Sequence, residues 1–135
     1  PLGEARMARQ GDDLVVIAWS YLVEVACRVS DALADEGLSV AVLDLRCLVP
    51  LDLAAIAAAV DHCGRVVVVE EASQTGGFAG EVVATIVEEC FWSLEAPVER
   101  VSGLDVPYPV GMVEDVFVPD EARITAAVRR TLETA

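Results

Sequence analysis

The sequence predicts an α/β fold, a three-layer α/β/α sandwich built around a mostly parallel sheet of roughly five strands. Strand-like apolar runs alternate with amphipathic helical segments along the 135 residues, an alternation typical of parallel sheets. The run of four valines at 66–69 suits a strand that is covered on both faces. Hydrophobic residues make up 55% of the chain and aromatic residues only 5%, so we expect a single domain with a core of valine, alanine and leucine.

The expected strands are short apolar runs bounded by turn-forming residues. The turn at 11–13 precedes the first buried strand, and we expect one further short strand before that turn, at an edge of the sheet. The strands are placed at 5–9, 14–19, 39–45, 66–69 and 98–102.

The expected helices carry apolar residues at helical spacing and begin or end at residues that favour helix termini. Ser20, Asp52 and Asp120 are candidate N-caps, because a short side chain with an oxygen atom accepts a hydrogen bond from an amide of the first turn. Gly37 and Gly64 are expected to end two of the helices. The helices are placed at 21–36, 53–62, 78–91 and 121–133, and 110–119 is expected to be a loop.

The net charge of −14, with nine arginines and no lysine, argues against nucleic acids and anionic membrane surfaces as partners. The charge makes basic partners more plausible than acidic ones, although solubility or a salt-rich host is the favoured explanation of the same charge. The sequence opens without a signal peptide, and no apolar run reaches the roughly 18 residues of a membrane span. We therefore expect a soluble protein of the cytoplasm.

The four cysteines do not form a C-x-x-C pair, and each lies in an apolar or helical context. Cys27, Cys47, Cys63 and Cys90 are therefore predicted to be reduced, buried thiols. His62 is the only histidine and lies in the last turn of an expected helix, where a structural role is favoured. No metal site is expected.

The turn after the valine strand is the first place to look for function, because ligands or partner subunits usually meet an open α/β sheet beyond the carboxyl ends of its strands. Glu70 and Glu71 are adjacent in an extended stretch, so their side chains point to opposite faces and cannot act together as acid and base. Helix caps or interface residues are the favoured interpretation. Thr75, Gly76 and Gly77 open a helix, but the phosphate-binding pattern G-x-G-x-x-G is absent, which favours a plain tight turn over an anion site.

Four segments resemble one family in the family's own order. VEEASQTGGF resembles the turn in the C-terminal domain of transketolase-like enzymes, specifically the beta subunits of thiamine-diphosphate-dependent 2-oxo acid dehydrogenases. DLRCLVPLD and LEAPVERVSGLDVPYP resemble two further motifs of that domain, and PLGEA resembles the end of its interdomain linker. The resemblance implies that residues 1–13 end a linker and carry the edge strand, and that residues 14–135 form a transketolase C-terminal-like domain.

The resemblance also implies where the chemistry of the parent enzyme lies. Such enzymes decarboxylate a 2-oxo acid and pass the acyl group to lipoamide, using thiamine diphosphate and magnesium. Their Gly-Asp-Gly motif with a downstream asparagine is absent, because this chain has no asparagine and its Gly11-Asp12-Asp13 precedes a strand. The activating glutamate lies in another domain of the family. We therefore expect no catalytic residue, and no cofactor or metal bound by this domain alone.

Partners are likewise implied by the resemblance: the alpha subunit, a second beta subunit, and the basic subunit-binding domain of dihydrolipoyl acyltransferase. Glu95 matches the acidic residue that meets the basic domain in the family, and Ala135 would supply the terminal carboxylate. The candidates for subunit interfaces and turns are Glu71, Thr75, Gly76, Gly77, Phe78 and Tyr108, and the aromatic residues Phe91, Trp92 and Phe117 also lie at element ends.

Two alternatives remain open at this point. The chain could be an independent α/β module that binds a nucleotide or an anion, or the same domain of another transketolase-like enzyme. Among the dehydrogenases, pyruvate, branched-chain 2-oxo acids and acetoin all remain open as substrates of the parent.

Overall fold

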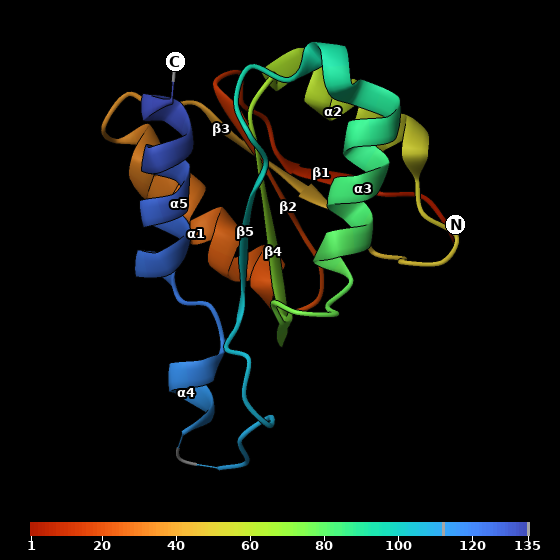
Figure 1. Cartoon of the computed structure of the whole chain (residues 1–135). Helices are drawn as coiled ribbons and strands as arrows, with labels where there is room; N and C mark the ends of the chain where they lie inside the picture. The colour runs from red at the N-terminus through yellow and green to blue at the C-terminus, as the bar shows by residue number, and fades with distance from the viewer. Residues whose placement is uncertain (112, 135) are drawn as a thin grey trace.

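A computed structural model describes residues 1–111 and 113–134 and contains one five-stranded sheet covered by helices on both faces (Figure 1). The α/β/α sandwich expected from the sequence is therefore confirmed. The strands are β1 (Arg6–Arg9), β2 (Leu14–Ala18), β3 (Val40–Asp44), β4 (Val66–Ser73) and β5 (Glu99–Gly103).

The strands lie in the order β1-β3-β2-β4-β5, and all neighbours are parallel except β1, which runs antiparallel to β3 at one edge. The central strand β2 is buried along its whole length, and its Val15 lies between Ala41 of β3 and Val66 of β4. Strands that are buried on both faces have no alternation of polar and apolar residues, which is why the valine run predicts a buried strand.

Two pairs of helices form the outer layers: α1 and α5 cover one face, and α2 and α3 cover the other (Figure 1). None of the helices within the described residues is long and apolar enough to cross a membrane. The helices are α1 (Leu22–Ala34), α2 (Leu53–Cys63), α3 (Ala79–Cys90), the 3-10 turn η1 (Phe91–Ser93), α4 (Glu114–Phe117) and α5 (Glu121–Glu133).

Two of the three expected N-caps are confirmed. Asp52 accepts a hydrogen bond from the backbone N–H of Ala55 at 3.0 Å, and Asp120 accepts one from Arg123 at 2.8 Å. The expectation for Ser20 is wrong: its φ is 58°, and α1 begins after Tyr21 without a side-chain cap. The left-handed backbone of Ser20 forms the turn between β2 and α1, and its side chain accepts no capping hydrogen bond from the first turn of α1.

The expected loop at 110–119 is also wrong in part, because it contains the one-turn helix α4. This segment extends from the body of the molecule beyond the ends of β4 and β5 (Figure 1). We call residues 104–111 and 113–118 the arm.

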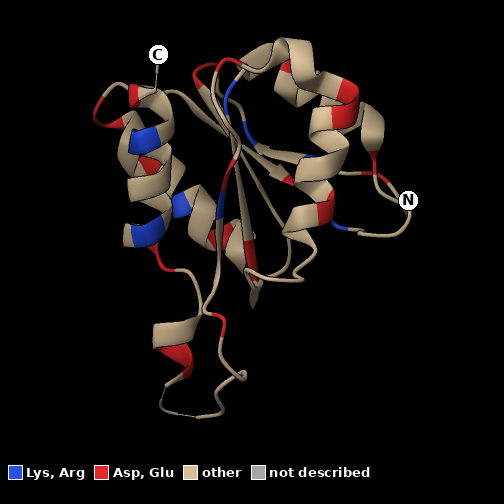
Figure 2. Cartoon of the chain, in the orientation of Figure 1, with Lys and Arg blue, Asp and Glu red and all other residues tan. Residues whose placement is uncertain are grey.

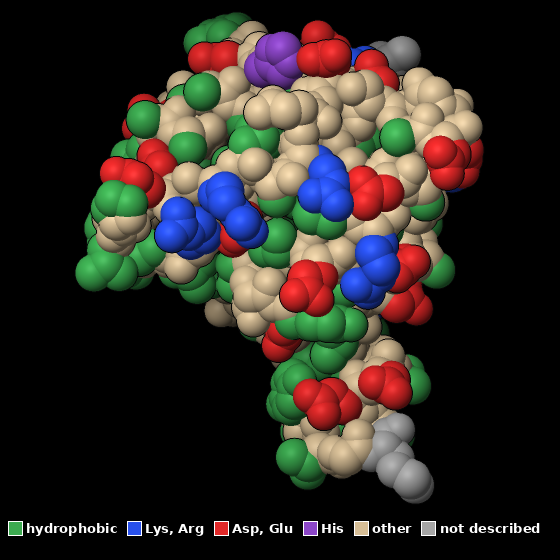
Figure 3. Space-filling model, turned by 180° about the vertical axis from the view of Figure 1, so that it is seen from behind, with side chains coloured by type: hydrophobic (Ala, Val, Ile, Leu, Met, Phe, Trp, Pro, Cys, Tyr) green, Lys and Arg blue, Asp and Glu red, His purple; other side chains and the backbone are tan. Residues whose placement is uncertain are grey.

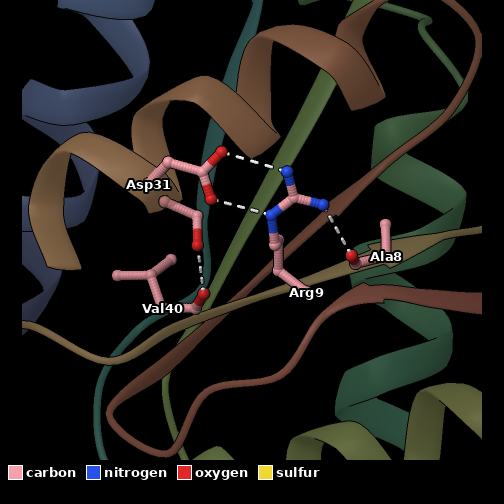
Figure 4. Close-up of polar contacts among 5 residues, drawn as sticks. Ala8, Arg9, Asp31 and Val40 are labelled. Atoms are coloured by element: carbon pink, nitrogen blue, oxygen red, sulfur yellow. Dashed lines mark hydrogen bonds and ion pairs between the residues drawn. The ribbon is translucent and has the colours of Figure 1, made fainter.

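Ion pairs fix the edge strand β1 to the helical layer beside it. Arg9 donates to both carboxylate oxygens of Asp31 in α1, at 2.7 and 3.0 Å, and to the carbonyl of Ala8 (Figure 4). Arg6 lies 3.2 Å from Asp44 of β3. Seen from behind, basic side chains on this face have acidic neighbours (Figure 3). The arginines here stabilise the fold and are not a free basic surface.

Candidate functional site

The order of the strands reverses direction at β2, since β3 lies on one side of it and β4 on the other. The crevice beyond the carboxyl ends of such strands is the usual ligand position in α/β proteins. Here Trp19, just after β2, and Phe78, just before α3, meet edge to face, with ring centroids 6.1 Å apart. Both rings pack against the core on the α2 and α3 side, so an aromatic pair lies where a ligand would enter.

Glu70 is a structural cap for α3. Its side chain is buried, and its two carboxylate oxygens accept hydrogen bonds from the backbone N–H of Ala79 at 2.9 Å and from the hydroxyl of Ser102 at 3.0 Å. A carboxylate is stabilised at a helix N-terminus by the amides and the helix dipole. Glu71 is only partly buried on the next position of the strand, as opposite orientations predict. The amide that an anion would need is therefore already occupied by Glu70.

The two glycines of the turn have different physical roles. Gly76 has φ of 80° and open space around its Cα, so it is needed for its backbone conformation. At Gly77 a Cβ would lie 2.3 Å from the Glu70 Oε1 and 2.5 Å from the carbonyl oxygen of Ser73. Gly77 therefore allows the backbone to pass close to the buried carboxylate.

Asp105 holds the tip of this turn against the start of the arm. Its carboxylate accepts hydrogen bonds from the backbone N–H of Thr75 at 2.8 Å and from the Thr75 hydroxyl at 2.7 Å. The bond from the backbone N–H lowers the pKa of Asp105 below its usual value, with a further contribution from the Thr75 hydroxyl. Thr75 is thus a turn residue whose partner is the Asp105 carboxylate.

Phe117 anchors the far side of the arm in the body of the protein. Its ring is buried, lies 4.7 Å from the ring of Tyr108, and occupies the space left by Gly103, where a Cβ would be 2.5 Å away. Arg123 of α5 donates to the carbonyls of Phe117 and Ser102. An aromatic residue at the end of an element can mark an interface or fill the end of the core, and Phe117 fills the core because Gly103 makes room for it.

Most of the other large apolar side chains described in the arm face solvent, whereas Val118 packs partly against the core. Tyr108 is half exposed, and its hydroxyl donates to Glu114 at 2.9 Å, a bond that raises the pKa of the tyrosine. The arm carries hydrophobic and acidic side chains together in the lower part of Figure 3. Its exposed large hydrophobic residues among those described are Leu104, Val106, Tyr108, Val110, Val113 and Val116.

A groove of about 680 Å³ runs beside the same turn. Its walls are mostly apolar, from the segment between β3 and α2 on one side and from Phe78 and the two glycines on the other, and Arg100 and Glu81 are also present. Val49 and Leu53 at its rim are well exposed. The carboxyl end of the sheet therefore presents a rigid turn, an apolar groove and an apolar arm.

Glu95 lies at the opposite end, next to the start of β4. Its backbone N–H donates to the carbonyl of Gly64 at 2.8 Å, and its carboxylate forms an ion pair with Arg65. The Glu95 side chain is 58% exposed and that of Arg65 is 25% exposed. The carboxylate is thus accessible but already has one cation. The other partner-binding candidate, Ala135, lies outside the described residues.

The cysteines and the histidine do not converge on a catalytic group. All four cysteines are free thiols, as predicted, but only Cys63 and Cys90 are buried, whereas Cys27 and Cys47 are partly exposed. Burial raises the pKa of the Cys63 thiol to about 11, which disfavours the reactive thiolate. Among the described residues, no group of three or more histidine, cysteine or acidic side chains is placed to hold a metal ion.

Asp12 and Asp13 do not fit a magnesium–diphosphate site. Asp12 lies 2.7 Å from the Nε2 of His62, and Asp13 accepts a hydrogen bond from the backbone N–H of Ser39 at 2.7 Å. Both residues precede β2 and so lie at the amino end of the sheet. Their carboxylates contact His62 of α2 and the backbone of Ser39 instead.

Sequence reasoning missed the partners of the site residues. Ser102, Asp105 and Arg65 lie about 30 positions from Glu70, Thr75 and Glu95, respectively, and meet them only because β4 and β5 are neighbours. Asp105 and Ser102 lie in the family motif around Pro97, and that motif was the one sequence feature that could have identified them as partners of the turn.

Comparison with known proteins agrees with this architecture. A family model described as "Transketolase, C-terminal domain" matches residues 3–124. The chain is 42% identical over 132 residues to the pyruvate dehydrogenase E1 component subunit beta of Leifsonia xyli subsp. xyli, covering 98% of this chain and 39% of that protein. It is 44% identical over 134 residues to the 2-oxoisovalerate dehydrogenase subunit beta of Pseudomonas aeruginosa, covering 98% of this chain and 37% of that protein.

Among solved structures, a split-gene transketolase described as an inactive beta4 tetramer superposes with a TM-score of 0.85 at 25% identity, covering 99% of this chain and 43% of that one. The chain spans about two fifths of the length of these relatives. The chain belongs to the transketolase C-terminal domain family, and its sequence is similar over almost its whole length to the beta subunits of 2-oxo acid dehydrogenases.

Proposed function

We propose that this domain is the assembly and docking part of the beta subunit of a thiamine-diphosphate-dependent 2-oxo acid dehydrogenase. The observation that carries the proposal is the row of exposed apolar side chains on the arm, at the end of the sheet where the turn is held rigid by Glu70 and Asp105. Polar groups that are fully used in capping and turn contacts suit a scaffold better than a reaction centre.

The arm and the groove are the proposed contacts with the second beta subunit and with the alpha subunit. Side chains such as Val110, which is 90% exposed, and Val116, which is 70% exposed, lose unfavourable hydration when a partner covers them. The base of the arm is fixed by Phe117, so little conformational entropy is lost on association. Glu71, Tyr108 and the Gly76–Gly77 turn lie at the same end and would form part of that interface.

Sedimentation velocity of the chain tests this association. We expect a concentration-dependent dimer whose dissociation constant rises when Val116→Asp places a charge in the apolar row. The matched control is Leu2→Asp, since Leu2 is 92% exposed and outside the arm. A strict monomer at high concentration, or equal effects of the two changes, would show that the arm does not bind a second copy.

Docking of the basic subunit-binding domain of dihydrolipoyl acyltransferase is proposed for the opposite end, through Glu95. Two observations support this: the Glu95 carboxylate is 58% exposed, and two further exposed glutamates, Glu88 and Glu89, end α3 just before the turn that leads to Glu95. Such a surface attracts a basic module over a Debye length of about 8 to 10 Å, so binding should weaken as salt is added.

Calorimetric titration of the chain with that basic domain tests the docking. Glu95→Ala should weaken binding by about 2 kcal/mol or more if the partner buries the charge pair and by under about 1 kcal/mol if the pair stays exposed, because it removes one acceptor and leaves Arg65 facing a basic partner. Glu81→Ala is the control, because it removes an equal charge at the start of α3 near the other end of the sheet. Unchanged affinity of Glu95→Ala at low salt would remove Glu95 from the docking site.

A further inference from the structure

We infer that Phe91 and Trp92 form the apolar centre of a surface that docks a basic protein module. This inference rests on the proposed docking function and adds the residues that would supply most of its binding energy. Trp92 is 93% exposed and Phe91 is 54% exposed, and their rings meet edge to face with centroids 5.1 Å apart. Tryptophan is enriched among the few residues that dominate interface energetics, whereas an unused exposed indole is unfavourable in water.

The aromatic pair is presented on a rigid turn. Both residues belong to η1, which follows α3 directly, and the N–H of Leu94 donates to the carbonyl of Phe91 at 3.3 Å. The hydroxyl of Ser93 donates to Asp61 of α2 at 2.5 Å, which joins η1 to the end of the neighbouring helix. A preorganised turn carrying aromatic rings loses little entropy when it binds.

Carboxylates surround this aromatic pair and identify the charge of the partner. Glu88 and Glu89 end α3 just before it, and Figure 2 shows acidic residues in red along this part of the helix. Asp61 accepts the hydrogen bond from Ser93 of η1, and Glu89 is two residues before Phe91, so both carboxylates lie close to η1. Glu95 follows on the other side. An apolar centre with an acidic rim is complementary to an apolar patch flanked by lysine or arginine.

The same charge pattern disfavours the other occupants. A second copy of this chain would bring another group of carboxylates to the rim, and like charges placed together cost several kcal/mol at an interface. A bilayer with anionic lipids would also be repelled. A basic protein module with an apolar face is therefore the occupant that fits.

The two tryptophans of the chain allow a direct test. In a Trp19→Phe background, Trp92 is the only fluorophore of its kind, and Trp19 is a suitable site because phenylalanine preserves its packing on Phe78. Titration at low salt with the basic subunit-binding domain should shift Trp92 emission to the blue and protect it from acrylamide, a neutral quencher that the acidic rim does not repel. Trp92→Ala should weaken calorimetric binding at least about tenfold, and Trp92→Phe should restore most of the affinity.

Leu2→Ala is the control, because it shortens an exposed apolar side chain that lies outside both the arm and η1 and should leave binding unchanged. If the module binds and Glu95→Ala weakens it, but Trp92 emission and the affinity of Trp92→Ala stay unchanged, the docking function stands and the aromatic centre is wrong. If the module does not bind the chain at low salt, both are overturned. A blue shift that grows with the concentration of the chain alone would identify a second copy as the occupant and contradict the inference.

Discussion

Replacing Glu70 by alanine should destabilise the protein strongly, although Glu70 contacts no ligand. The side chain is 1% exposed, and its removal leaves the N–H of Ala79 and the hydroxyl of Ser102 without an acceptor in a buried site. Each stranded group costs about 1 to 2 kcal/mol, and the lost charge at the start of α3 adds about 0.5 kcal/mol. We therefore expect a loss of about 2.5 to 4.5 kcal/mol in the free energy of unfolding, a large share of the total for a domain of this size.

Urea unfolding followed by circular dichroism measures this loss, with two matched variants. Glu70→Gln should cost only about 1 kcal/mol, because the amide oxygen still accepts from Ala79 and the Ser102 hydroxyl can turn to accept from the amide nitrogen. Glu71→Ala, one position along the strand and only partly buried, should stay within about 0.5 kcal/mol of the unchanged protein. If Glu70→Ala costs no more than Glu71→Ala, the capping role of the buried carboxylate is refuted.

Three further predictions concern the turn, the amino-terminal segment and the cofactor. Gly76→Ala should lower the free energy of unfolding by about 1 kcal/mol, through the positive φ alone. Gly77→Ala should lower it by about 2 to 3 kcal/mol, because the added Cβ would meet the backbone and the buried carboxylate of Glu70. Equal losses for the two variants in urea unfolding would contradict this distinction. Hydrogen bonds from the backbone N–H groups of Ala5 and Ala55 lower the pKa of Asp52 in the folded protein. The stability that these bonds provide is therefore present above the unfolded pKa of about 3.9 and is lost as the pH falls through the lower folded pKa. Asp52→Asn should remove this part of the acid dependence of stability, and an unchanged profile of stability against pH would contradict the prediction. Calorimetric titration of the chain with thiamine diphosphate and magnesium should show no micromolar binding, since Asp12 and Asp13 serve loop contacts, and a micromolar isotherm would reverse this view.

The parts of the fold that the sequence predicted are those encoded by neighbouring residues. The valine run identifies β4, and Asp52 and Asp120 identify helix starts, because a cap and the amide it binds are three positions apart. Ser20 is a residue type that often caps helices, but its backbone is left-handed, and no local sequence pattern distinguishes a capping serine from a turn serine. Residue type alone therefore over-predicts caps.

The contacts that build the candidate site were not predictable in the same way, because they join residues about 30 positions apart. Glu70 meets Ser102, and Thr75 meets Asp105, only when β5 is placed beside β4. The aromatic residues at element ends show the same limit. Phe117 is buried because Gly103 leaves space for its ring, whereas Trp92 is exposed, and that space is a property of the packed structure.

Arg65 limits the proposed docking at Glu95, so its removal should tighten binding of the basic subunit-binding domain. Its guanidinium pairs with the Glu95 carboxylate, and it is the only cation in the sequence between His62 and Arg100. In Arg65→Gln the carboxylate is released to the partner and the local field becomes more negative. Exposed charge pairs contribute about 0.3 to 1 kcal/mol, so we expect a two- to five-fold lower dissociation constant at low salt and a steeper salt dependence.

The control is Arg129→Gln. It removes a cation of α5 that pairs with Glu36, away from Glu95, and should leave the affinity nearly unchanged. Circular dichroism must show the same fold for both variants, because the Nε of Arg65 is buried without a hydrogen-bond partner among the described residues and glutamine does not reproduce the ion pair. Weaker binding of folded Arg65→Gln would mean that Arg65 orients Glu95 for the partner instead of competing with it. In that case the charge of the Glu95 surface alone would not explain docking, and the geometry of the Arg65–Glu95 pair would have to be part of the recognition.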